Sequence, residues 1–330
     1  MNINFTQQSS GMSYSSQVSD HDCIIYRFMS IMFISTSIIS FVWNIRFLLI
    51  DRHRLKPLVL NLIINSFIFI TFSLPYILVQ SIKCYPIQSY IICCFQSFIC
   101  FTCGICVMYT TSLLALVQYI KLFYNSSRIY QMIEKKNNFL IPLLCWLISL
   151  FWSLPPLINS KPGFIRHGQG FDCGLNWIRA DIHSRLYLFL AFIFIYFLPL
   201  LCLLYTNISI LITIRKLIYR RHPLIPKPGE KIPIDMRHHF IDRFTVIESN
   251  RLKRLRIDRR FAQATMITVL HYLLAWTPYL ICGILQMLIA MKYVYYEIPS
   301  TILIVSALTA KMAVTGQSCV YFFTIRSLNK

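Results

Sequence analysis

The sequence predicts an all-α membrane protein, a seven-transmembrane helix bundle with an extracellular N-terminus and a cytoplasmic C-terminus. Of its 330 residues, 56% are hydrophobic and only 13% are charged, whereas soluble domains are about 25% charged. The apolar residues gather in seven segments, each long enough to cross the roughly 30 Å hydrocarbon core of a bilayer as a helix. Basic residues concentrate in alternate loops, and this asymmetry gives the orientation.

The seven spans are expected near residues 26–50, 57–81, 90–122, 138–158, 186–216, 259–290 and 298–323. Together they make residues 26–323 one transmembrane domain, preceded by an extracellular tail (1–25) and followed by a short cytoplasmic tail (324–330). The N-terminal tail lacks a basic stretch followed by an apolar core, so no cleavable signal peptide is expected. The first span is therefore expected to act as its own insertion signal.

Basic residues crowd the loops that follow the first, third and fifth spans. They are Arg52, Arg54 and Lys56, then Lys121, Arg128, Lys135 and Lys136, then those between Arg215 and Arg260. Since basic loops stay in the cytoplasm, the chain is predicted to be a multi-pass protein of the cell membrane. Asn4, in the sequon Asn4-Phe5-Thr6, is then a glycosylation site. The same clustering argues against nucleic acid as the partner of a chain with net charge +20.

The loop 217–258, predicted to be cytoplasmic, has two parts. The stretch HPLIPKPGEKIP is rich in Pro and Gly and is expected to be a flexible linker. The run RLKRLRIDRR is expected to extend the sixth span into the cytoplasm, where it contacts anionic lipid headgroups or a cytoplasmic partner. The pair His238-His239 has no matching cluster of ligands, so no metal site is predicted.

Lys311 lies in the middle of the seventh apolar segment. A lysine at this depth costs roughly 2.5 to 3.5 kcal/mol on insertion scales, so it must face the protein interior and find a partner there. Two roles are open. Lys311 is either a structural lysine paired with a carboxylate, or an amine that condenses with a carbonyl group to form a Schiff base.

Several motifs resemble the rhodopsin-like family of G-protein-coupled receptors. They are Asn44, LNLIIN (60–65), Trp146 with Pro155-Pro156, Pro199, and Ala275 to Tyr279 around Trp276-Thr277-Pro278. Two further matches are specific to the opsins within that family. FDCGLNW (171–177) resembles the loop that closes the opsin pocket, and Lys311 stands six residues before Gln317-Ser318-Cys319-Val320-Tyr321, the opsin spacing.

The resemblance implies a retinal cofactor, 11-cis or all-trans, bound to Lys311 as a Schiff base. It also implies a disulfide between Cys93 and Cys173, although the adjacent Cys94 competes with Cys93. The remaining pocket residues that it implies are Gly104, which leaves room beside the polyene, and Trp177, Tyr196, Tyr272, Trp276, Tyr279 and Ala307.

A protonated Schiff base needs a negative charge nearby. The two positions where opsins carry a counterion are the neutral Gln96 and His167 in this sequence. Of the twelve acidic residues, only Asp172, beside Cys173, is expected to reach the ligand. Three alternatives remain: Asp172 is the counterion, the Schiff base is unprotonated, or a bound anion takes the place of a carboxylate.

The sequence departs from the family on the cytoplasmic side. The acid-Arg-Tyr triplet of the third helix is Val117-Gln118-Tyr119, so Gln118 cannot form the ion pair of the family with an acid such as Asp258. The motif that ends in Tyr321 lacks its proline, and Ser66 and Asn207 replace the usual aspartate and tyrosine. Gln118, Tyr119, Asp258 and Tyr321 are the expected G-protein-side residues. Ligand binding is thus better supported than coupling.

The function that these features predict is a light-activated receptor of the opsin type, not an enzyme. Its expected partners are a heterotrimeric G protein and membrane lipid. One alternative is a retinal photoisomerase, an opsin-like enzyme that releases retinal isomers with weak or no G-protein coupling. The other is a divergent receptor that does not sense light.

Overall fold

The computed structural model describes residues 20–50, 57–85, 87, 89–123, 139–158, 163–167, 170–179, 181–219, 234–296 and 298–327. The helices are α1 (Asp20–Ile50), α2 (Pro57–Lys83), α3 (Tyr90–Phe123), α5 (Leu140–Ile158), α6 (Ile182–Ala191), α7 (Leu198–Tyr219), α8 (Ile234–Ala290) and α9 (Ser300–Ser327). A π-helical segment, η2 (Phe192–Phe197), joins α6 to α7, so these three elements form one continuous helix.

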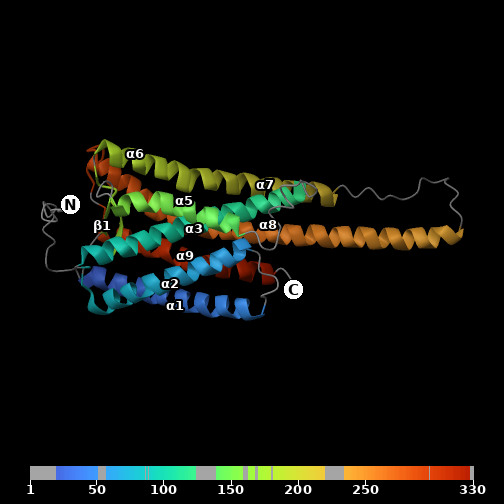
Figure 1. Ribbon diagram of the computed structural model, residues 1–330, viewed down its shortest axis with the longest axis horizontal. Coiled ribbons are helices and arrows are strands. Elements are labelled where there is room, and N and C mark those ends of the chain that lie inside the picture. Colours follow the sequence, from blue (N-terminus) through green and yellow to red (C-terminus); the bar gives the residue numbers. More distant parts are fainter. Residues whose placement is uncertain are drawn as a thin grey trace.

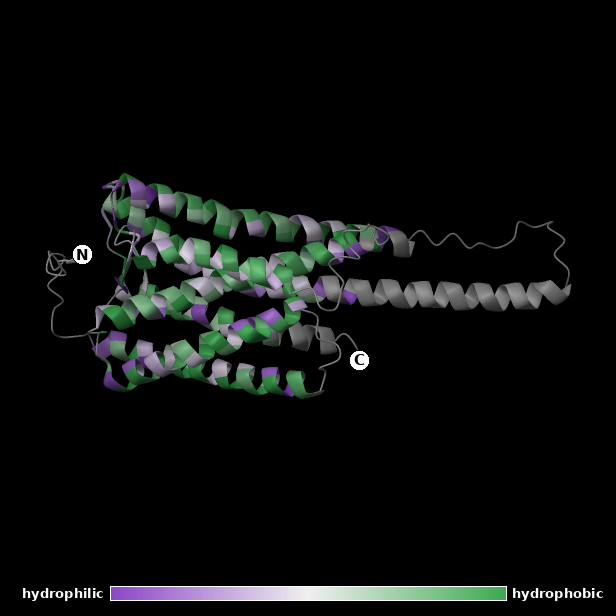
Figure 2. Ribbon diagram, viewed as in Figure 1, coloured by the Kyte–Doolittle hydropathy of each residue, from purple (hydrophilic) through white to green (hydrophobic). Residues whose placement is uncertain are grey.

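Seven helices in the described part of the chain are long and apolar enough to cross a membrane, which confirms the predicted bundle. They lie alongside one another, with the β hairpin at one end of the bundle and the end of α9 at the other (Figure 1). Figure 2 shows hydrophobic residues along most of the length of the bundle helices. Helix α3 occupies the centre, because it contacts α2, α5, α7, α8, α9 and both strands.

The helix of the sixth span begins earlier than the sequence predicted, before the run RLKRLRIDRR that was expected to extend it. Helix α8 starts at Ile234 and contains 57 residues, about 85 Å at 1.5 Å per residue, and it projects beyond the bundle (Figure 1). The predicted loop 217–258 is therefore helical from Ile234 onward. The reason is visible in the sequence, because the last proline of the linker is Pro233 and neither Pro nor Gly recurs before Pro278.

The fifth span changes its helical pitch at η2, close to Pro199. A proline inside a helix lacks the N–H group that would bond to the preceding turn, and π-helical turns frequently occur at functional sites. Side chains of α3 donate hydrogen bonds to carbonyl groups of this region. The Tyr109 hydroxyl donates to the Phe194 carbonyl (2.8 Å), and the Ser112 hydroxyl donates to the Pro199 carbonyl (3.2 Å). The fifth span is thus anchored to α3 where it passes the pocket described below.

The two antiparallel strands β1 (Phe164–His167) and β2 (Asp172–Leu175) form a hairpin in which His167 pairs with Asp172. A disulfide joins Cys173 to Cys93 at the start of α3, and Cys94 is a free, buried thiol. The disulfide therefore uses the first of the two adjacent cysteines that the sequence left in competition. A second disulfide, between Cys23 of α1 and Cys84 after α2, was not predicted.

Candidate functional site

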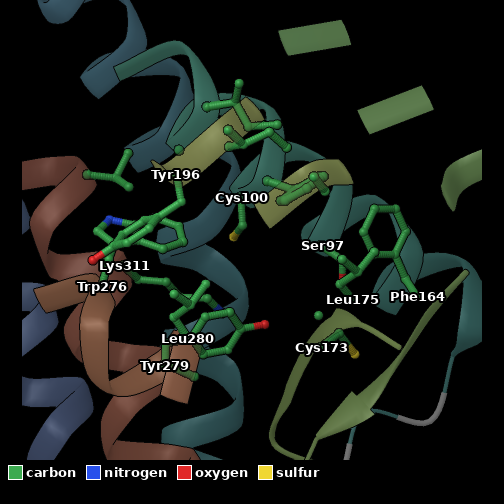
Figure 3. Close-up of a pocket in the computed structure, with 18 of the residues that line it drawn as sticks. Ser97, Cys100, Phe164, Cys173, Leu175, Tyr196, Trp276, Tyr279, Leu280 and Lys311 are labelled. Carbon is green, nitrogen blue, oxygen red and sulfur yellow. The ribbon is translucent and has the colours of Figure 1, made fainter. Parts of the chain in front are cut away.

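A pocket lies in the half of the bundle that the hairpin covers. Its walls come from α3, from the fifth span at α6 and η2, from α8 and α9, and from β2 and the residues around it; Figure 3 shows part of this lining. The lining is aromatic and aliphatic apart from a few polar groups. It includes every pocket residue that the resemblance implied, Gly104, Trp177, Tyr196, Tyr272, Trp276, Tyr279, Ala307 and Lys311, and also the candidate counterion Asp172.

Lys311 and Asp172 form an ion pair in this lining. The Lys311 Nζ contacts the Asp172 Oδ1 directly, and each residue is only 6% exposed. The same carboxylate oxygen accepts a hydrogen bond from the Cys173 backbone N–H at 2.8 Å. Removing one partner of a buried ion pair leaves an uncompensated charge and costs about 3–5 kcal/mol, so each of these residues depends on the other.

The geometry of the hairpin is what brings Asp172 to the lysine. Asp172 is the first residue of β2, pairs across the strands with His167, and immediately precedes the disulfide-bonded Cys173. The His167 ring nitrogen Nε2 lies 3.0 Å from the Leu175 carbonyl. Since a carbonyl oxygen only accepts, Nε2 carries the proton. The pKa of His167 is lowered, because burial disfavours the charged ring more strongly than the nearby Asp172 favours it. The ring therefore stays neutral.

Three aromatic side chains of α8 form one wall. The Tyr272 and Trp276 rings are stacked with centroids 5.5 Å apart, and the Trp276 and Tyr279 rings meet edge to face at 6.2 Å. Trp177, which follows β2, meets Tyr279 edge to face at 6.3 Å. A Cβ at Gly104 would lie 2.8 Å from Trp276 Cη2, so a larger residue there would push the indole ring away from α3. These ring contacts fix the orientation of the aromatic side chains in the wall.

The other two implied pocket residues lie on different helices. Tyr196 belongs to η2, and its hydroxyl group is 2.9 Å from the Thr277 hydroxyl of α8. This contact ties the π-helical segment to the wall that carries Trp276. Ala307, 5% exposed, lies one helical turn before Lys311 on α9, where a small side chain leaves the lysine accessible from the cavity.

Sequence reasoning missed two neighbours of the ion pair. Cys100 lines the same pocket as Lys311 and Asp172. Its position could have been found, because it lies one turn before Gly104 on the same face of the third helix. Tyr26 of α1 was also missed; its ring stacks on Phe171, beside Asp172, with centroids 4.7 Å apart. Nothing in the sequence around Tyr26 indicates this tertiary contact.

Neutral hydrogen bonds connect α3 to α8 and α9 below the pocket. The Thr265 hydroxyl donates to the Gln118 Oε1 at 3.2 Å. Gln317 Nε2 lies 3.4 Å from the Thr268 carbonyl and 3.5 Å from the Thr111 hydroxyl. That leaves Gln317 Oε1 as the acceptor for His271 Nδ1 at 3.3 Å, so Nδ1 carries the imidazole proton.

The other residues predicted for the cytoplasmic side are only partly described. Tyr119 packs against Phe123 and Tyr205, with ring centroids 4.5 and 6.0 Å apart. The backbones of Asp258 and Tyr321 are helical, but their side chains lie outside the described part of the structure, as does all of Asn4. The predicted roles of these three residues stay predictions.

The residues present fit the retinal that the opsin resemblance implies. A carbonyl compound needs an amine to bind it covalently, and Lys311 supplies a buried one. A long conjugated chain needs apolar, shape-specific walls, which the aromatic residues of α8 and η2 supply. A cation in such surroundings needs a negative charge nearby, and the Asp172 carboxylate lies in contact with the amine.

Comparison with known proteins agrees with this architecture. Residues 51–315 match the family of 7 transmembrane receptors (rhodopsin family). Melanopsin-A of Danio rerio is 28% identical over 176 residues, which cover 53% of this chain and 27% of that protein. Melanopsin of Phodopus sungorus is 25% identical over 228 residues (69% and 44%), and a rhodopsin of Procambarus milleri 26% over 139 residues (42% and 41%). The chain thus spans less than half the length of each of these relatives.

The fold is similar to that of squid rhodopsin, whose crystal structure superposes with a TM-score of 0.68 at 16% sequence identity, covering 95% of this chain and 84% of that one. The seven apolar helices in the described part of the chain, together with this fold, define the class as an integral membrane protein with a seven-helix bundle. Within that class, the chain belongs to the rhodopsin family of seven-transmembrane receptors.

Proposed function

We propose that this protein is an opsin-type photoreceptor that binds retinal covalently through Lys311 and responds to light as a G-protein-coupled receptor. The observation that carries the proposal is the buried contact between Lys311 and Asp172 inside an aromatic pocket. The melanopsins and rhodopsin among the relatives support it. Retinal, when bound, supplies the absorption of light and the change of shape that follows it.

Asp172 is proposed as the counterion. Its carboxylate lies against the Lys311 nitrogen, so it would stabilise a positive charge at that atom. Its hydrogen bond from the Cys173 N–H holds that carboxylate oxygen in place beside the lysine. This favours Asp172 over the two alternatives, an unprotonated nitrogen and a bound anion.

The remaining pocket residues position the ligand and exclude water. Trp276 is held between Tyr272, Tyr279 and the space left at Gly104, so a ligand that changes shape beside it would move α8. The neutral contacts Thr265–Gln118 and His271–Gln317 join α8 to α3 and α9 farther down the bundle. Light would thus shift the population from an arrangement with these contacts to one without them.

The proposed orientation places the hairpin and the N-terminus outside the cell membrane. The two disulfides, Cys93–Cys173 and Cys23–Cys84, gather at the hairpin end, as expected for the oxidising side of a membrane. The long basic helix α8 would then project into the cytoplasm, toward anionic lipid and a heterotrimeric G protein. In the same orientation, Asn4 would be available for glycosylation.

The second candidate function is a retinal photoisomerase that uses the same pocket. Gln118 favours it, because this side chain is bound to Thr265 by a neutral hydrogen bond where the family resemblance leads one to expect a charged arginine. Two assays separate the candidates. Light-dependent nucleotide exchange on a panel of G proteins supports the receptor, whereas multiple turnovers of added retinal in the light support the photoisomerase.

The first experiment is spectroscopic. The protein is expressed in cells, supplied with 11-cis or all-trans retinal, and purified in the dark. We expect an absorption band that is absent without retinal and that changes on illumination. A receptor that does not sense light would give no such band with either isomer.

A further inference from the structure

The first two turns of α1 contact three other parts of the molecule, the end of α2, the hairpin and the start of α9, through four residues: Asp22, Cys23, Tyr26 and Arg27. We call these residues the α1 brace. Each of them makes a contact that no feature of the sequence indicated. Together they connect α9, which carries Lys311, to the hairpin, which carries Asp172.

The brace is fixed to α2 by two contacts. Cys23 forms a disulfide with Cys84, just beyond the end of α2. The Arg27 guanidinium donates to the carbonyl groups of Ser81 and Ile82, at 3.1 and 3.2 Å. These bonds satisfy carbonyls in the last turn of α2, which have no partner within their own helix. The start of α1 therefore has a fixed position relative to α2.

Two other contacts run from the brace toward the ion pair. The Asp22 Oδ1 accepts a hydrogen bond from the Thr301 hydroxyl at 3.1 Å, at the start of the helix that carries Lys311. The Tyr26 ring stacks on Phe171, the residue before Asp172, with centroids 4.7 Å apart and planes inclined by 20°. Tyr26 is only 1% exposed.

We propose that Tyr26 is a positioning residue for Asp172, and that the α1 brace fixes the position of the hairpin relative to α9. The Phe171 ring lies on a rigid surface provided by Tyr26, so the backbone that carries the Asp172 carboxylate cannot move away from Lys311. The expected effect on a retinal pigment rests on the proposed function. The hairpin's mobility can be measured without any ligand.

The variants are chosen to separate positioning from packing. Tyr26→Leu removes the ring that supports Phe171, and Tyr26→Phe keeps it. Phe33→Leu is the matched control, because Phe33 is an equally buried aromatic residue of α1 whose ring meets Phe69 of α2 and lies two turns away from Tyr26. Thr301→Val removes the hydrogen bond between α9 and Asp22 of the brace with little change in side-chain volume.

The first readout is hydrogen exchange of the ligand-free protein. Tyr26→Leu should speed the exchange of amides in β2 (Asp172–Leu175) by about fivefold, because the hairpin opens locally more often. Tyr26→Phe should restore the wild-type rate, and Phe33→Leu should leave β2 unchanged. Equal effects of Tyr26→Leu and Phe33→Leu on β2 would show that Tyr26 contributes packing alone, and would overturn the inference.

The second readout applies once a pigment has formed. Tyr26→Leu should make the dark pigment react several-fold faster with hydroxylamine, which attacks the Lys311 linkage, and Thr301→Val should act in the same direction. If Tyr26→Leu does not fold, Thr301→Val decides: unchanged β2 exchange in that variant would also contradict the brace. A wild-type protein that forms no pigment would contradict the proposed function and leave the exchange result standing.

Discussion

The Lys311 ammonium group and the Asp172 carboxylate lie in contact inside the bundle, although 139 positions separate them in the sequence. Lys311 comes from the seventh span and Asp172 from the hairpin that closes the pocket. Both are buried, and neither charge could be accommodated there without the other. Their contact therefore couples the position of the hairpin to the position of α9.

Replacing Asp172 by Asn should change the titration of the dark pigment. The carboxylate stabilises a positive charge at the Lys311 nitrogen, so its removal should move the loss of visible absorption to a pH lower by several units. A pH titration of the wild type and of Asp172→Asn measures this shift. An unchanged titration would rule out Asp172 as the counterion and favour a bound anion.

Replacing Cys93 or Cys173 by Ser should each reduce the amount of folded protein at the cell surface. The disulfide between them holds β2 on α3, and loss of a structural disulfide typically costs about 2–5 kcal/mol. Surface labelling and thermal unfolding measure the effect. Cys94→Ser is the control, because this thiol is free; if only that variant were damaging, the pairing would be wrong by one residue.

Acid should weaken the hairpin through His167. Burial lowers the pKa of His167 in the folded protein below its ordinary value of 6.5. The neutral ring thus contributes its full stability above about pH 6.5, and this stability is lost as the pH falls from there through the folded pKa. Thermal unfolding of the ligand-free protein between pH 8 and 5 measures the loss.

The matching variant is His167→Gln, which should flatten that part of the stability profile because it cannot take up a proton. His183, an exposed histidine at the start of α6, is the control. If His183→Gln flattened the profile as much as His167→Gln, the acid sensitivity would have another origin.

Replacing Thr265 by Val should loosen the resting contact between α3 and α8. The hydrogen bond to Gln118 is neutral, and such bonds contribute about 0.5–1.5 kcal/mol each. We therefore expect nucleotide exchange in the dark to rise by roughly two- to tenfold on any G protein that the receptor activates. Thr268→Val is the control, since among the described residues its hydroxyl donates within its own helix, to the Ala264 carbonyl. An equal rise in both variants would contradict a specific role for Thr265.

Much of the fold follows from the sequence, because a bilayer demands long apolar helices. The seven spans, and the need of Lys311 for a buried partner, could be predicted from length, polarity and one charge inside an apolar segment. The sequence predicted that the run RLKRLRIDRR would extend the sixth span, but it left residues 234–250 in the loop, whereas α8 starts at Ile234. Helix propensity and the absence of Pro and Gly decide that boundary.

The site was predicted less completely than the fold. The register around Lys311 and Cys173 indicated residues that do line one pocket. Tyr26 and the Cys23–Cys84 disulfide could not be predicted, because they depend on how α1 packs on α2 and on the hairpin. The hydrogen bond from Thr265 to Gln118 likewise depends on the relative rotation of α3 and α8.

The most direct test of the account is to find where retinal is attached. The dark protein is supplied with retinal, reduced with borohydride to make the linkage permanent, and digested, and the modified peptide is sequenced by mass spectrometry. We expect the modification at Lys311, in the peptide from α9, and no pigment from Lys311→Ala. Attachment at another lysine, or a normal pigment from Lys311→Ala, would contradict the account.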